Sequence, residues 1–120
     1  MIKVKRAYQL ASVTDGRRFL VDRVWPRGRR KVDLQIEAWL KDAGPSAELR
    51  KWFGHDTRRW PEFQERYRRE LEAHPNVLVP LLAAGRSGDV TLVYGARDEQ
   101  HNQAVIIKHV LDAHLTSERT

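Results

Sequence analysis

The feature that constrains the fold most is a strand-to-helix unit near the end of the chain. Residues 89–94 are rich in β-branched and aromatic side chains, which is typical of a strand. They lead through residues 95–98 into a predicted helix over residues 99–115, whose apolar positions cover one wide face. Because a helix with such a face lies against a sheet, this unit predicts an α/β fold.

The other expected elements follow from local patterns of apolar residues and turn signals. They are strands over residues 3–8 and 19–25, a turn around Asp15-Gly16, and helices over residues 33–44, 46–54 and 61–75. Residues 77–84 are too few for periodicity to separate a helix from a strand. The 120-residue chain is therefore expected to form one compact domain over residues 1–120, with a small twisted, mostly parallel sheet and helices on both of its faces.

The chain has no cysteine, which excludes disulfides, thiolate zinc sites and thiol nucleophiles. No pair of histidines has the spacing of a metal site, since His109 and His114 face different sides of a helix, so no metal is expected. The charged first residues lack the apolar run of a signal peptide, and the longest apolar stretch is interrupted by Pro80. We therefore expect a cytoplasmic protein without a membrane partner.

Positive charge is concentrated at the N-terminal end of the sequence. Residues 1–31 contain ten Lys and Arg against two Asp, a balance of +8, whereas the rest of the chain carries −2. Such a localised positive field predicts an anionic partner.

A charged pair, Asp22-Arg23, interrupts the hydrophobic strand predicted over residues 19–25. Alternation along a strand sends the two side chains to opposite faces of the sheet. Since burial of an unpaired charge is costly, each side chain needs a hydrogen-bond network or a ligand. The structural alternative is that Asp22 pairs with an arginine or with backbone amides.

Arg27 follows the carboxyl end of this strand, where open α/β sheets place ligands. Its planar guanidinium suits a phosphate or carboxylate, and Gly28 allows close approach of a backbone, so Arg27 and Arg23 are expected to clamp an anion. Trp25, just before them, is a candidate platform for stacking a base. The alternative is that residues 27–31 form a solvated basic loop. We expect this for Arg29 and Arg30, and the anion clamp for Arg27.

A second group of polar residues follows the strand at residues 89–94. Arg97, Asp98, His101 and Asn102 lie at the junction with the last predicted helix, whose N-terminus offers free amides to an anion. The alternative is that Asp98 simply caps that helix. His55, after a predicted helix end, titrates near neutral pH and is a candidate for proton transfer, although a loop histidine more often bonds to the backbone.

Conventional enzyme signatures are absent from the sequence. It has neither a P-loop nor a glycine-rich dinucleotide fingerprint, and no serine in a nucleophile elbow. These absences disfavour conventional hydrolase and dehydrogenase functions, and no cofactor is identified.

Several motifs spread over nearly the whole chain resemble the YeaO-like family of small bacterial proteins of unknown function. They are Lys5-Arg6, residues 21–28 (Val-Asp-Arg-Val-Trp-Pro-Arg-Gly), Pro45-Ser46, residues 49–53, Trp60-Pro61 with Phe63 and Tyr67, and residues 91–94 with Asp98 and Asn102. The resemblance implies a compact α/β domain and a cytoplasmic bacterial protein, and it brings no established reaction.

Three functions are compatible with these features. The leading hypothesis is a site for a small anionic ligand, a nucleotide or another phosphorylated metabolite, formed by Arg23, Arg27, Asp98 and Asn102. If a reaction occurs there, Asp22, His55 or Asp98 would move the proton; the sequence leaves open whether the protein is an enzyme. The alternatives are a nucleic-acid-binding module that uses the basic N-terminal quarter, and a structural or protein-interaction domain.

Overall fold

Four parallel strands form a single sheet in the order β1-β4-β2-β3 in the computed structural model, which describes residues 1–119. The strands are β1 (Ile2–Arg6), β2 (Arg17–Leu20), β3 (Ala38–Trp39) and β4 (Val90–Tyr94). β4 pairs with β1 on one side and with β2 on the other. Every residue of β4 is buried, so its central position agrees with its continuous apolar pattern.

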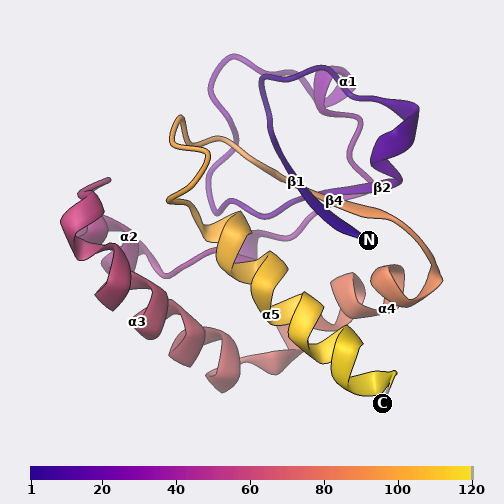
Figure 1. Ribbon diagram of the computed structural model, residues 1–120. Helices are drawn as coiled ribbons and strands as arrows, with labels where there is room; N and C mark the ends of the chain where they lie inside the picture. The colour runs from indigo at the N-terminus through magenta and orange to yellow at the C-terminus, as the bar shows by residue number, and fades with distance from the viewer. Residues whose placement is uncertain (120) are drawn as a thin grey trace.

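The helices lie mainly on one side of the sheet (Figure 1). They are α1 (Lys31–Leu34), α2 (Ala47–Phe53), α3 (Trp60–Ala73), α4 (Val79–Ser87) and α5 (Gln103–Glu118), with short 3-10 segments η1 (Val13–Asp15), η2 (Lys41–Ala43), η3 (Thr57–Arg59) and η4 (Pro75–Leu78). α5 packs on β1 and β4, and α4 packs beside it on β4. α2 and α3 extend this helical layer away from the sheet.

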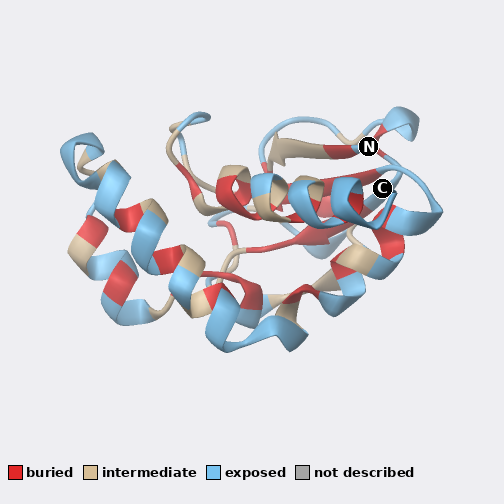
Figure 2. Cartoon of the chain, turned by 60° about the horizontal axis from the view of Figure 1, so that its bottom comes forward, coloured by how far each residue is buried: buried red, intermediate tan, exposed pale blue. Residues whose placement is uncertain are grey.

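Two hydrophobic clusters cover the two faces of the sheet. The larger cluster joins the sheet to the layer of α2 to α5, and its buried residues form the red bands facing inward in Figure 2. The smaller cluster consists of Ala7, Leu20, Leu34 and Val93, with Trp25, Ile36 and Trp39 packed against it. The predicted α/β class is confirmed, and the second face is covered by the single turn of α1 together with loops.

Several predicted elements are confirmed at their ends. Ser46 caps α2 by accepting a hydrogen bond from the Leu49 amide at 3.1 Å, and Gly54 ends the helix in the left-handed conformation. α3 begins beside Pro61, as expected. The ambiguous residues 77–84 are helical, because η4 continues into α4.

The helix predicted over residues 33–44 is wrong. α1 ends at Leu34, and Gln35 adopts a left-handed conformation. The apolar residues at helical spacing serve two different cores, since Ile36 and Trp39 pack on the smaller cluster and Leu40 packs on the larger one. β3 forms here because its backbone pairs with the free edge of β2.

Other predicted boundaries are also corrected. The strand expected over residues 19–25 ends at Leu20; the Val21 amide still donates to the carbonyl of Val93, and the chain then leaves the sheet. The strand expected over residues 3–8 ends at Arg6. The last helix starts at residue 103 instead of 99, because residues 98–101 form a separate turn.

No helix within residues 1–119 is long and apolar enough to cross a membrane.

Candidate functional site

Asp22 joins the carboxyl ends of two strands to the start of α5. Its Oδ2 accepts a hydrogen bond from the Gly95 amide at 2.8 Å, and its Oδ1 accepts one from the Gln103 side chain. Burial raises the pKa of Asp22 to about 6, against the lowering effect of these two hydrogen bonds and of the Arg50 charge. A Cβ on residue 95 would lie 3.0 Å from Asp22 Oδ2, so glycine permits the close approach of this carboxyl group.

Asp98 and Asn102 organise the turn that precedes α5. The Asp98 carboxylate accepts from the amides of Gln100 at 2.9 Å and His101 at 3.0 Å, and it lies 2.9 Å from His101 Nδ1. Hydrogen bonds from the Gln100 backbone and the His101 side chain lower the pKa of Asp98. Asn102 is the N-cap of α5, accepting from the Val105 amide and donating to the Asp98 carbonyl. The polar groups of both residues are therefore engaged within the fold.

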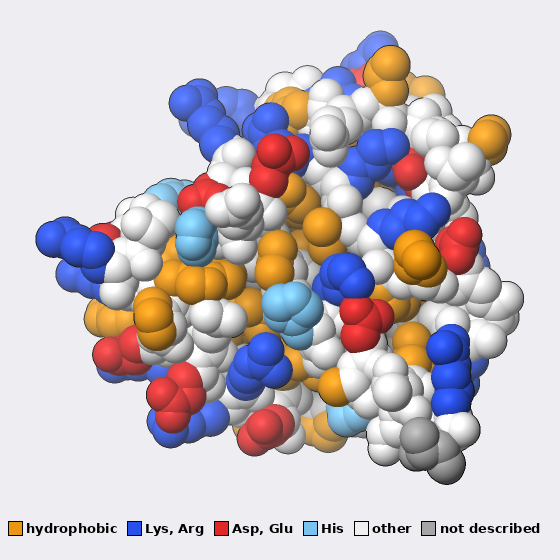
Figure 3. Space-filling model, in the orientation of Figure 1, with side chains coloured by type: hydrophobic (Ala, Val, Ile, Leu, Met, Phe, Trp, Pro, Cys, Tyr) orange, Lys and Arg blue, Asp and Glu red, His pale blue; other side chains and the backbone are white. Residues whose placement is uncertain are grey.

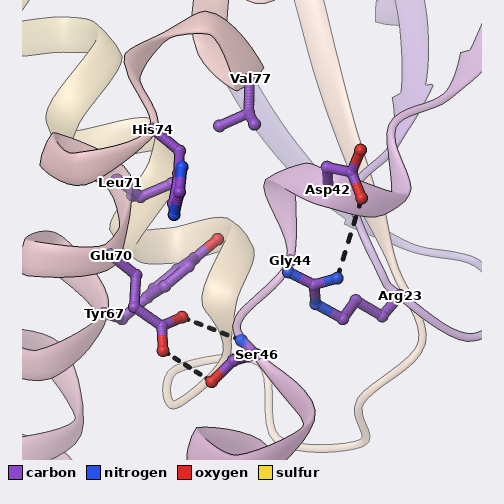
Figure 4. A pocket seen from close by; sticks show the side chains of 9 residues that line it. All are labelled: Arg23, Asp42, Gly44, Ser46, Tyr67, Glu70, Leu71, His74 and Val77. Carbon is purple, nitrogen blue, oxygen red and sulfur yellow. Dashed lines mark hydrogen bonds and ion pairs between the residues drawn. The ribbon is translucent and has the colours of Figure 1, made fainter.

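Arg23 lies in a separate cavity of about 160 Å³ between the loop after β3 and the C-terminal half of α3 (Figure 4). Its Nε donates to the Pro45 carbonyl at 2.6 Å, and its Nη1 lies 3.8 Å from the exposed Asp42 carboxylate. On the opposite wall, the Glu70 carboxylate accepts hydrogen bonds from the Ser46 amide and hydroxyl at 2.9 and 2.6 Å, and His74 follows the end of α3. The residues that line this cavity come from neither the 27–31 nor the 95–102 loop, so Arg23 does not share a cavity with Arg27 and Asp98.

His55 lies at the end of α2, in a left-handed conformation directly after Gly54. It is exposed, and its ring packs at a centroid distance of 6.3 Å from Phe53. Within residues 1–119 it makes no hydrogen bond or ion pair with Asp22 or Asp98. His101, by contrast, packs edge-on against Trp60 at 5.1 Å, which links the starts of α3 and α5.

Three loop segments meet where β1, β2 and β4 end. Arg6 Nε donates to the Ala96 carbonyl at 2.9 Å, which connects the end of β1 to the loop after β4. Arg29 Nε donates to the Ala7 carbonyl at 2.9 Å, which connects the loop after β2 to the end of β1. We call the four arginines carried by these segments the cationic edge: Arg6, Arg27, Arg29 and Arg97.

The arginines of the cationic edge differ from most others in forming no ion pair. Among residues 1–119, none of the four forms an ion pair with a carboxylate, although the pKa of Asp33, lowered mainly by its hydrogen bonds from Arg30, is also lowered by the charge of Arg29. Most other arginines do: Arg17, Arg18, Arg23, Arg30, Arg58, Arg59, Arg66, Arg69 and Arg86. Figure 3 shows blue side chains projecting at the upper left of the molecule, over the loops that follow β2 and β4. This end of the sheet therefore carries positive charge that no ion pair within the fold neutralises.

Aromatic side chains hold the loop after β2 in place. Trp25 Nε1 donates to the Arg29 carbonyl at 2.6 Å, and its ring packs edge-on against Trp39 at 5.2 Å. The Tyr8 hydroxyl donates to the Arg27 carbonyl at 2.8 Å. Gly28 has a φ of 78° with open space beside it, so its role is to permit the turn of this loop.

Sequence patterns missed Arg6, Tyr8 and Arg29 as members of this region; Arg29 was expected in a solvated loop, but its Nε is bonded to the Ala7 carbonyl. Arg6 ends β1, and its guanidinium is oriented by a carbonyl 90 residues away in the sequence. Tyr8 is 42% exposed, with the guanidinium groups of Arg6 and Arg29 over its ring at 5.1 and 5.9 Å. The one available signal was the position of Tyr8 at the end of the strand predicted over residues 3–8; Arg6 lies inside that predicted strand.

The described residues offer no metal centre. No group of three or more His, Asp or Glu side chains within residues 1–119 is placed to hold a metal ion.

Comparison with known proteins identifies the family. A family model described as the inactive DUF488-N3 subclade matches residues 1–120. The chain is 39% identical to the uncharacterized protein YeaO of Escherichia coli (strain K12) over 106 residues, which cover 88% of this chain and 92% of that protein. It is 38% identical over 111 residues to the uncharacterized protein Rv3073c of Mycobacterium tuberculosis (strain H37Rv), with 92% and 93% of the two chains covered. No solved structure gives a significant match. The chain therefore belongs to the YeaO-like family of uncharacterised proteins, within the inactive DUF488-N3 subclade.

Proposed function

We propose that this protein binds a phosphorylated small molecule, such as a nucleotide, at the cationic edge, without transforming it. The observation that carries the proposal is the absence of ion pairs to the four arginines of this edge among residues 1–119. Unneutralised guanidinium groups gathered at one place attract an anion, and their planar forks match phosphate oxygens.

The position and orientation of these groups support the same function. Open α/β sheets bind ligands beyond the carboxyl ends of their parallel strands, and the cationic edge lies there. Arg6 and Arg29 are each held through Nε by a backbone carbonyl, which leaves their Nη groups to bind a ligand in a fixed geometry. Arg27 and Arg97 are exposed and make no side-chain hydrogen bond or ion pair within residues 1–119, so both are available to an incoming phosphate.

Binding without catalysis is favoured by two considerations. The family model that matches the chain is described as an inactive subclade. In addition, the carboxylates of Asp22 and Asp98 are hydrogen-bonded within the fold. His55, which follows the end of α2, makes no hydrogen bond or ion pair with either of them within residues 1–119. We assign Asp22, Asp98 and Asn102 the role of positioning the loops that carry the arginines.

Calorimetric titration with ADP and with inorganic pyrophosphate tests this function. The double variant Arg27→Ala/Arg97→Ala should bind both probes at least about tenfold more weakly than the unmodified protein, because each charge-assisted hydrogen bond contributes roughly 1.5–3 kcal/mol. Binding should also weaken as salt is added, whereas adenosine, which lacks phosphate, should bind poorly.

The double variant Arg58→Ala/Arg69→Ala is the matched control. It removes two positive charges, as the test variant does, but from exposed arginines that pair with Asp56 and Glu65. This control should leave binding unchanged. The proposal fails if neither probe binds, or if the control weakens binding as much as the test variant. A single-stranded oligonucleotide that binds where ADP does not would instead favour the nucleic-acid function.

A further inference from the structure

A second feature of the molecule is an apolar groove at the end of the helical layer distant from the cationic edge. α3, η4, α4 and α5 enclose a hollow of about 570 Å³. Its lining is mostly apolar and includes Leu71, Leu78, Val79, Leu82 and Val110. The groove uses the C-terminal halves of α3 and α5, whereas the starts of these two helices meet at His101. It is therefore separate from the proposed anion site.

One wall of the groove carries an apolar side chain that the fold leaves in solvent. Val79, at the start of α4, is 55% exposed although it lines the hollow. Leu71 and Leu78, in the floor, are buried. The same surface thus presents both a projecting apolar side chain and a concave apolar floor.

The rim of the groove carries two unpaired charges of opposite sign. Arg68 and Glu72 lie one turn apart on α3, and neither forms an ion pair within residues 1–119. On the same helix, Glu62 pairs with Arg66, and Glu65 pairs with Arg69. In those pairs the glutamate precedes the arginine, which is the favourable order along a helix; Arg68 and Glu72 have the reverse order.

We propose that a second copy of this chain covers the groove in a two-fold symmetric dimer. In such an interface one surface must supply both members of every contact. Val79 of each protomer would fill the hollow of the other, and Arg68 of each would face Glu72 of the other. A small apolar ligand would fill the hollow and leave both rim charges unpaired, so the rim favours a second copy.

Sedimentation over a range of protein concentrations tests the dimer. The unmodified protein should approach twice the mass of one chain as concentration rises. Arg68→Glu and Glu72→Arg should each weaken self-association by roughly tenfold or more, since each places like charges opposite one another twice in a symmetric dimer. Arg58→Glu, an exposed charge reversal in η3, serves as the control and should self-associate normally.

An equimolar mixture of the two single variants gives the sharpest readout. In the mixed dimer, the two reversed positions would face one another with opposite charges and the remaining native pair would be intact, so association should return. This recovery also establishes that neither variant has misfolded. A protein that stays monomeric at the highest concentration overturns the proposal, as does a dimer insensitive to both reversals or a mixture that does not associate.

Discussion

Replacing Asp15 by alanine is expected to destabilise the fold by about 3–5 kcal/mol, the usual cost of removing one partner of a buried ion pair. Asp15 accepts hydrogen bonds from Arg18 Nη1 at 2.6 Å, Lys5 Nζ at 3.0 Å and the Ser12 amide at 2.9 Å. Arg18 is only 5% exposed, and its Nη2 already lacks a hydrogen-bond partner among the described residues. The variant would therefore leave a buried guanidinium charge without its counterion. Urea unfolding followed by tryptophan fluorescence measures the loss.

Asp33→Ala is the comparison for this prediction. Asp33 pairs with the exposed side chain of Arg30 and accepts from the Arg30 amide at 2.8 Å at the start of α1, so its removal should cost about 1–2 kcal/mol. If Asp15→Ala were no more destabilising than Asp33→Ala, the buried network around Arg18 would not have the role assigned to it.

Replacing Asp22 by asparagine is expected to stabilise the protein near neutral pH by up to about 3 kcal/mol, with the gain vanishing towards about pH 4. Burial raises the pKa of Asp22 from an ordinary value of 3.8 to about 6. Between these two values the folded protein holds a proton that the unfolded chain has released, so stability falls as pH rises through this range and is constant above it. Asparagine avoids this cost of ionisation. The asparagine side-chain carbonyl can accept from the Gly95 amide. Its NH2 group can donate to the side-chain oxygen of Gln103 once the Gln103 amide has flipped.

Urea unfolding at several pH values measures this effect. Asp22→Ala is the control, because it removes the charge but leaves the Gly95 amide without its partner; it should be less stable than the asparagine variant at every pH. An asparagine variant with the same pH dependence as the unmodified protein would contradict the raised pKa of Asp22.

Elements with local signals could be predicted from the sequence. β4 has a continuous apolar run, and α2 is bounded by Ser46 and Gly54, whose capping roles depend on neighbouring residues alone. The segment at residues 33–44 could not be predicted in this way. Its apolar spacing fits a helix, but tertiary packing divides its side chains between two cores, and backbone pairing with β2 replaces helical hydrogen bonds.

The candidate site was predictable only in part for the same reason. Arg27 and Arg97 follow strand ends, and this position alone identified them as ligand candidates. Arg23 was expected beside Arg27, but β2 ends at Leu20, and the chain then directs Arg23 to the carbonyl of Pro45. The orientation of Arg6 depends on a carbonyl in a loop distant in sequence, which no local pattern records.

The most direct test of the cationic edge is nuclear magnetic resonance of the arginine Nε–Hε groups during titration with ADP. The account predicts saturable shifts of the four signals of the cationic edge, whereas that of Arg86, paired with Glu118, stays unchanged. The absence of saturable shifts at the cationic edge, or shifts confined to Arg23 in its separate cavity, would contradict it.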